Sequence, residues 1–202
     1  MTRISTILAA TVLGAGTASA ATLDFEGFAP GQTVTDVSVG GANATVTVDS
    51  NGAVDRAVIF DTLNPTGGDT DLDFSDPAGP QFGNVLIIQE NEGEPDDETL
   101  GGTITFAFDR AVTFDGFDGL DDIVVTVTSN LGDVFALPVP QDGGFGSASG
   151  LGFAGINTLT FDFSGSGAID NLQISAIPVP AALPLLGLAL GGLGYLGRRR
   201  RG

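Results

Sequence analysis

The sequence predicts an all-β domain, an antiparallel β-sandwich, across residues 21 to 176. Apolar and polar residues alternate over many short segments, as in 103–109, where Ile104, Phe106 and Phe108 share one face. Clusters of glycine, proline, asparagine and aspartate separate these segments, as expected for turns. No segment of this region has the 3.6-residue period of an amphipathic helix. Short strands with frequent turn signals favour a jelly roll.

The elements follow in order along the domain. Residues 84–90 form a nearly continuous apolar run, which fits a central strand covered on both faces. Long loops are expected at 61–83 and 91–98, which are acidic, and at 141–155, which is rich in glycine. The 14 phenylalanines are expected to fill the core. The expected strands are 22–26, 33–39, 43–49, 57–60, 84–90, 103–109, 112–117, 122–128, 133–137, 159–163 and 168–175.

The predicted domain is strongly acidic. All 25 Asp and Glu residues lie between Asp24 and Asp170, where Arg56 and Arg110 are the basic residues. Nucleic acid is therefore not an expected partner, because phosphate binding needs clustered Lys and Arg. The negative charge disfavours a compact state by self-repulsion, so bound cations, ambient salt or wide spacing on loops must offset it.

The sequence contains neither cysteine nor histidine. Disulfides are excluded, so stability depends on the hydrophobic core and on any bound metal. Catalysis by Ser-His-Asp or Cys-His groups and zinc sites with histidine ligands are also excluded.

The N-terminus predicts export. Residues 1–20 have the features of a signal peptide, with Arg3 before an apolar core at 7–15. Ala18-Ser19-Ala20 is a small-x-small site for signal peptidase, so the mature chain is expected to begin at Ala21.

Residues 177–202 predict a membrane anchor. An uncharged apolar run at 181–197 is at the short end of what crosses a bilayer as a helix. The run ends in Arg198, Arg199, Arg200 and Arg201, which keep that end on the cytoplasmic side. The acidic domain is therefore expected on the outer side of the membrane.

The same segment resembles a family of bacterial sorting tags. Ile177, Pro178, Val179, Pro180 and Ala181 stand before the apolar run and the arginines. This order is similar to the PEP-CTERM group and its VPLPA-CTERM variant, although two aliphatic residues differ from V-P-L-P-A. The resemblance implies that the chain faces the periplasm at the inner membrane, that an exosortase processes it near Pro180-Ala181, and that it then reaches the cell surface.

A candidate calcium site joins the two ends of the domain. Asp24-Phe25-Glu26-Gly27 opens the first expected strand, and Ala168-Ile169-Asp170-Asn171-Leu172 opens the last. This pairing resembles carbohydrate-binding-module and galactose-binding-like jelly rolls, where a Glu and an Asp help to hold a structural Ca²⁺. The resemblance implies Glu26 and Asp170 as ligands, and such oxygen ligands suit Ca²⁺. The alternative is two ordinary carboxylates at strand ends.

The long loop is a second candidate calcium site. Its expected ligands are Asp61, Asp69 and Asp71, with Glu90 as a further candidate. The loop is not an EF-hand. It lacks the glycine at the sixth position, and Pro80 occupies the position of the final glutamate. The alternative is a solvated acidic loop.

The expected function is non-enzymatic. Asp121-Asp122 and Asp96-Asp97-Glu98 are pairs of the kind that glycoside hydrolases use, but no hydrolase motif surrounds them. We expect an exported structural or adhesive protein of an extracellular polysaccharide or biofilm matrix. The alternative is a non-catalytic carbohydrate-binding module, which an exposed Tyr or Trp would favour, but residues 21–176 contain neither.

Overall fold

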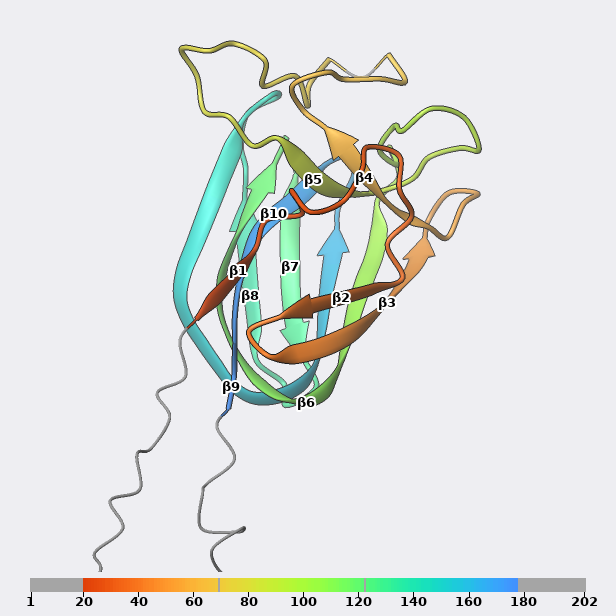
Figure 1. Cartoon of the computed structure of the whole chain (residues 1–202). Coiled ribbons are helices and arrows are strands. Elements are labelled where there is room, and N and C mark those ends of the chain that lie inside the picture. Colours follow the sequence, from red (N-terminus) through yellow and green to blue (C-terminus); the bar gives the residue numbers. More distant parts are fainter. Residues whose placement is uncertain (1–19, 69, 122, 178–202) are drawn as a thin grey trace, which may run out of the picture. The chain divides into compact units, whose positions relative to one another are not determined.

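The computed structural model describes residues 20–68, 70–121 and 123–177, and all the regular structure among them is β-strand (Figure 1). The prediction of an all-β domain is therefore confirmed. None of these residues belongs to a helix that could cross a membrane. The strands are β1 (Ala21–Leu23), β2 (Asp36–Val39), β3 (Ala42–Ser50), β4 (Ala57–Asp61), β5 (Asn84–Ile88), β6 (Gly102–Leu120), β7 (Val124–Ser129), β8 (Val134–Pro138), β9 (Phe145–Phe163) and β10 (Ala168–Ala176).

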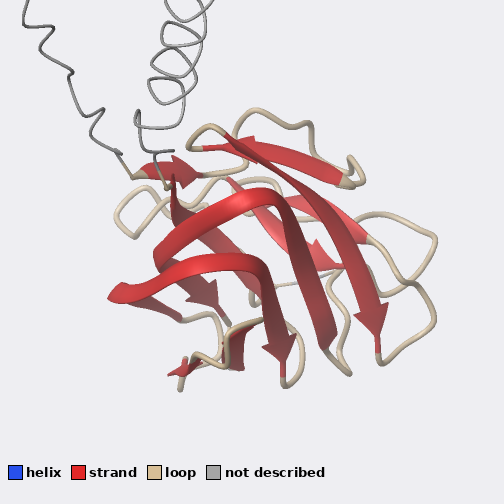
Figure 2. Ribbon diagram, turned by 90° about the horizontal axis from the view of Figure 1, so that it is seen from below, coloured by secondary structure: helices blue, strands red, loops and turns tan. Residues whose placement is uncertain are grey.

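Two long strands, β6 and β9, organise the sheet. They pair antiparallel from Gly102↔Phe163 to Leu120↔Phe145, with a register shift between Ala107 and Val112. Figure 2 shows long strands that bend along their length. The first part of β6 also pairs with β3, and the second part pairs with β10. A register irregularity bends a strand and changes its direction. The bend therefore allows the β6–β9 pair to contribute to two parts of the sheet.

The strand order is β4-β5-β10-β6-β9-β7-β8, with β1 on β10, β3 on β6 and β2 on β3. Every recorded pairing between these strands is antiparallel. Folded on itself at the bends, this arrangement is consistent with the predicted β-sandwich.

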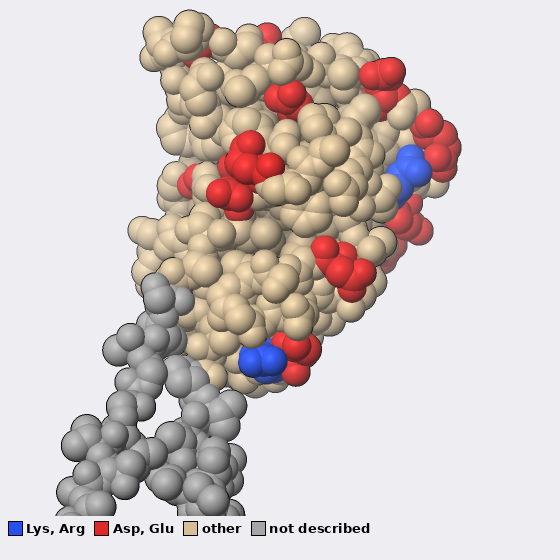
Figure 3. Space-filling view, viewed as in Figure 1, with Lys and Arg blue, Asp and Glu red and all other residues tan. Residues whose placement is uncertain are grey.

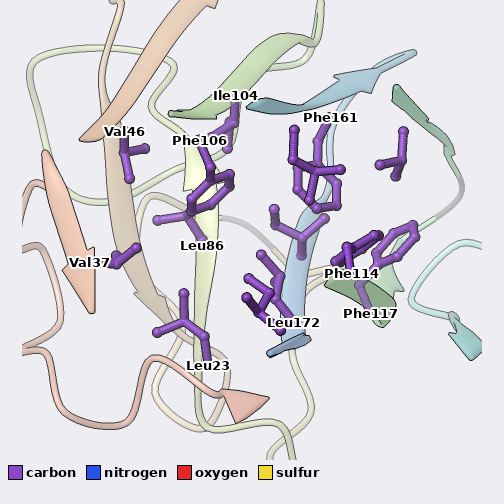
Figure 4. Close-up of a cluster of buried hydrophobic side chains, with 14 of the residues drawn as sticks. Leu23, Val37, Val46, Leu86, Ile104, Phe106, Phe114, Phe117, Phe161 and Leu172 are labelled. Carbon is purple, nitrogen blue, oxygen red and sulfur yellow. The ribbon is translucent and has the colours of Figure 1, made fainter. Parts of the chain in front are cut away.

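Aromatic rings from the long strands form the centre of the core (Figure 4). Phe161 of β9 contacts Phe106, Phe114 and Phe117 of β6 at centroid distances of 5.7, 5.8 and 5.3 Å. All three contacts are edge-to-face, the geometry that the ring quadrupole favours. The four side chains are at most 1% exposed, so the alternation read from 103–109 and 159–163 is borne out.

The apolar strand β5 is buried along its whole length, as predicted. Leu86 and Ile88 belong to the main core, whereas Val85 and Ile87 belong to a second apolar cluster. Leu72, Phe74 and Phe82 of the long loop complete this second cluster. The loop is therefore a cover for the outer face of β5.

Two expectations about elements were wrong. The stretch 141–155, expected to be a loop, contains the first part of β9, which begins at Phe145. Glycine is accommodated there because the paired strands come very close: a Cβ at Gly116 of β6 would collide with the Ala148 carbonyl. The strands expected at 103–109 and 112–117 are one bent strand, because β6 continues through its register shift.

Several predictions lie outside the described residues. They are the signal peptide at 1–20, apart from Ala20, the candidate ligand Asp69, and the sorting segment from Pro178 through Val179, Pro180 and Ala181 to the arginines at 198–201.

Candidate functional site

Asp170 is a buried carboxylate next to an irregularity in β10. The register of β10 against β6 shifts between Asp170 and Gln173. Asn171, within this shift, has a φ of 54°, in the left-handed region that asparagine tolerates better than most residues. The neighbouring side chain of Asp170 is only 1% exposed.

The hydrogen bonds of Asp170 leave one oxygen unsatisfied. Its Oδ2 accepts a hydrogen bond of 3.0 Å from the Asn171 side-chain amide, which also donates to Asp118 Oδ2 at 2.8 Å. Its Oδ1 is buried and has no hydrogen-bond partner. An unpaired buried carboxylate oxygen is costly, so this atom calls for a ligand or a proton.

The electrostatic surroundings of Asp170 are negative. Burial is the main cause that raises the pKa of Asp170 to about 8, against a smaller lowering by a hydrogen bond from the Asn171 backbone. The charges of Asp118, Asp24 and Glu26 act in the same direction as burial. We call Asp24, Glu26, Asp118 and Asp170 the Asp170 cluster. The structure thus brings the sequence-predicted pair, Glu26 and Asp170, into one electrostatic neighbourhood.

A tight turn after β1 positions Glu26. Phe25 has a φ of 56° and is fully buried, which anchors the turn. Glu26 Oε1 accepts a hydrogen bond of 2.8 Å from the Asn84 backbone N–H at the start of β5. The Asn84 amide donates to the Phe28 carbonyl at 2.9 Å, so two bonds hold the turn against β5.

The Asp170 cluster is a candidate for a hard cation by its ligand type and not by its geometry: among the described residues, the three carboxylates that converge within 4.8 Å are those of Asp71, Asp121 and Asp142. The Asp170 cluster offers carboxylate oxygens, the ligands that Ca²⁺ prefers. The two arginines of the described residues bind elsewhere, Arg56 to Glu92 at 3.1 Å and Arg110 to Asp109 at 3.2 Å. In Figure 3 each blue side chain likewise lies against a red one. Neither arginine of the described residues therefore neutralises Asp170.

Asp24 and Asp118 are members of the cluster that sequence reasoning missed. Asp118 lies opposite Asp170 in the antiparallel pairing of β6 with β10. This proximity depends on which strands pair, and no local motif marks it. Asp24 is two residues before Glu26, and that spacing was a signal that could have included it.

A second acidic group contains one of the predicted loop ligands. Asp71, Asp121 and Asp142 each offer a carboxylate oxygen within 4.8 Å of the others; we call them the Asp121 cluster. Asp121 is 1% exposed, has a φ of 72°, and accepts a hydrogen bond of 3.3 Å from the Gly143 N–H. Acidic groups of this kind are common without a metal, so the geometry alone does not identify one.

Two of the other predicted loop ligands, Asp61 and Glu90, are not in the group that contains Asp71, and Asp69 lies outside the described residues. Asp61 accepts hydrogen bonds of 2.9 Å from the Leu63 N–H and the Asn64 amide, which closes its own turn. Glu90 accepts one of 3.0 Å from the Thr99 hydroxyl.

Two carboxylates of the Asp96-Asp97-Glu98 stretch, which resembles the acidic pairs of glycoside hydrolases, form hydrogen bonds within the fold. Asp97 is 6% exposed and accepts a hydrogen bond of 2.7 Å from the Ser166 hydroxyl. Burial above all raises the pKa of Asp97 to about 6, and the charges of Asp71 and Asp121 add to the effect. Glu98 accepts a hydrogen bond of 3.0 Å from the Leu100 N–H.

The sequence matches no protein-family model, and a search of curated proteins found no significant match.

Proposed function

We propose that this chain is an exported, non-enzymatic surface protein whose β-sandwich is stabilised by calcium at the Asp170 cluster. The unpartnered, buried Oδ1 of Asp170 carries this proposal. A cation there would offset the repulsion from Asp24, Glu26 and Asp118, which a proton offsets only below the raised pKa of Asp170. The sandwich is, in this proposal, a jelly roll of the galactose-binding-like kind.

The biological role in this proposal is structural or adhesive, in an extracellular polysaccharide or biofilm matrix. Signal peptidase removes residues 1–20, the helix at 181–197 holds the chain at the inner membrane, and an exosortase cuts near Pro180-Ala181. The order of motif, apolar run and arginines in the sequence supports this route.

Deletion of residues 178–202 tests the sorting route. We expect the truncated protein to be found in a different cell fraction from the full-length protein, and mass spectrometry of the full-length product to find a C-terminus near Pro180. An unchanged location and an uncut tail would contradict the route.

Calcium titration of the EDTA-treated, full-length protein by calorimetry tests the metal site. Asp170→Asn keeps the side-chain shape and removes the charge, and we expect calcium affinity to fall at least tenfold. Asp36→Asn is the matched control, because it removes one charge from an exposed position on β2. If Asp142→Asn weakens binding and Asp170→Asn does not, the Asp121 cluster holds the ion and the assignment to Asp170 is wrong.

A carbohydrate-binding module without catalytic activity is the second candidate. The observation that favours it is Phe145, the one phenylalanine of the described residues with an exposed side chain, at 48%, although it is not the Tyr or Trp that such a site would favour. Saturable, sugar-specific binding on a glycan array would favour this candidate over the structural role.

A further inference from the structure

An open pocket lies between the long loop and the segment before β9. Its volume is about 390 Å³, within the range of small-molecule sites. The long loop contributes Asp73, Phe74 and Asp76, and the other side contributes Val139, Gln141 and Phe145. The pocket is separate from the Asp170 cluster, since no member of that cluster lines it.

One wall of the pocket is aromatic and held in place. The Phe145 ring contacts Phe82 edge-on, with centroids 5.2 Å apart, and Phe82 contacts Phe74 in the same way at 4.9 Å. Phe74 is buried in the second apolar cluster, so the row is anchored to the fold. Phe145, at the outer end of the row, remains 48% exposed. A fixed, half-exposed ring presents a negatively polarised face to a ligand.

The polar groups of the lining are mainly acceptors. Asp73 Oδ1 accepts a hydrogen bond of 2.9 Å from the Ser75 N–H, and Asp76 Oδ1 accepts one of 2.9 Å from the Ala78 N–H. These turns fix both carboxylates. Hydrogen bonds from Ser75 also lower the pKa of Asp73, which keeps it ionised.

The lining has few donors to offer a ligand. Gln141 is the one lining side chain with an N–H group, and none of the lining residues is basic. Pro80 and Pro140 have no backbone N–H. Five backbone donors of the lining are used within the fold: the N–H groups of Gly79, Gly144, Phe74 and Val139 bond to carbonyls, and that of Gly143 bonds to Asp121.

We propose that this pocket binds a small organic ammonium ion against the face of Phe145 and the carboxylates of Asp73 and Asp76. Aromatic faces and carboxylates both attract a cation, and an ammonium ion requires no donor from the protein. An anion would be repelled, and a sugar would find Gln141 as the one donating side chain of the lining.

Calorimetric titration of the full-length protein with choline tests this proposal, with 3,3-dimethyl-1-butanol and methyl glucoside as comparison probes. The butanol has the shape of choline without its charge. Saturating calcium is present throughout, so the result does not depend on the calcium site. We expect choline to bind saturably and the neutral analogue to bind at least tenfold more weakly.

Variants locate the binding. Phe145→Leu and Asp73→Asn should each weaken choline binding about tenfold, while Asp36→Asn, an equal change of charge on β2, should leave it unchanged. Phe145 and Asp73 are exposed, so both variants should fold, and circular dichroism checks this. The proposal is overturned if choline does not bind, if its neutral analogue binds equally well, if methyl glucoside binds more tightly, or if Asp36→Asn weakens binding as much as Asp73→Asn.

Discussion

Asn171 is the residue that holds the Asp170 cluster together. Its amide bridges Asp118 and Asp170, and its backbone adopts a left-handed conformation that costs other non-glycine residues about 1–2 kcal/mol. Its contribution therefore has two parts, one from the amide donors and one from the backbone.

Replacement by glycine and by alanine separates the two parts. Asn171→Gly keeps the backbone conformation and loses the donors, whereas Asn171→Ala loses both. We expect the alanine variant to be less stable than the glycine variant by about 1 kcal/mol in urea unfolding, because alanine tolerates a positive φ poorly. Equal stability of the two variants would contradict the assigned strain.

Asp97 is expected to make stability depend on pH. Its pKa is about 6 in the folded protein against an ordinary value of 3.8, so the folded state keeps a proton that the unfolded state releases. The free energy of unfolding should therefore fall as pH rises from about 4 to about 6, by up to about 3 kcal/mol.

The matched variant is Asp97→Asn, whose side-chain oxygen can still accept the Ser166 hydrogen bond. Its free energy of unfolding, measured in EDTA, should decrease less over this pH range than that of the parent protein, because the asparagine does not titrate. A pH dependence identical to that of the parent protein would show that Asp97 is not responsible.

At the scale of the elements, the sequence predicts strands better than it predicts their connections. Alternation located β3 and the inward face of 103–109, because one buried face imposes a period of two on any sequence. The first part of β9 was missed because its glycines have low strand propensity. Pairing with the distant strand β6 overrides that propensity, and this contact is not local in sequence.

The residues of the candidate site were likewise predictable where a local motif marks them, and were missed where contacts between distant segments bring them together. Glu26 lies in a short motif just after β1 and Asp170 in one within β10, and a family resemblance identified them. Asp118 enters the cluster only through the pairing of β6 with β10, and Asp121 meets Asp71 through the fold of the long loop. No spacing in the sequence encodes these two contacts.

The long strands should contribute most of the stability through their aromatic contacts. Phe161→Ala removes a fully buried ring that contacts three others, and we expect a loss of about 3–5 kcal/mol in urea unfolding. Phe145→Ala, on the same strand but half-exposed, is the control and should cost about 1 kcal/mol or less. Similar losses of unfolding free energy for the two variants would contradict a core centred on Phe161.

At the scale of the whole molecule, charge opposes folding. The domain contains 25 acidic residues and two arginines, and each arginine already forms an ion pair with one acidic residue. Apolar burial across the bent sheet must overcome this repulsion without help from disulfides, since the chain has no cysteine. Screening by salt should therefore stabilise the domain.

Thermal melting in EDTA at increasing sodium chloride measures this effect. We expect the Tm to rise by several degrees between low salt and about 0.5 M, because the Debye length falls well below 10 Å. A Tm that falls or stays constant would mean that the carboxylates are spaced too widely to repel one another.

Specific calcium binding predicts an effect beyond this screening. The direct measurement is the Tm of the full-length protein at constant ionic strength, with millimolar calcium and with EDTA, for the parent and for Asp170→Asn. The account predicts that calcium raises the Tm of the parent and does so much less for Asp170→Asn. A parent protein that melts at the same temperature in calcium and in EDTA would contradict it.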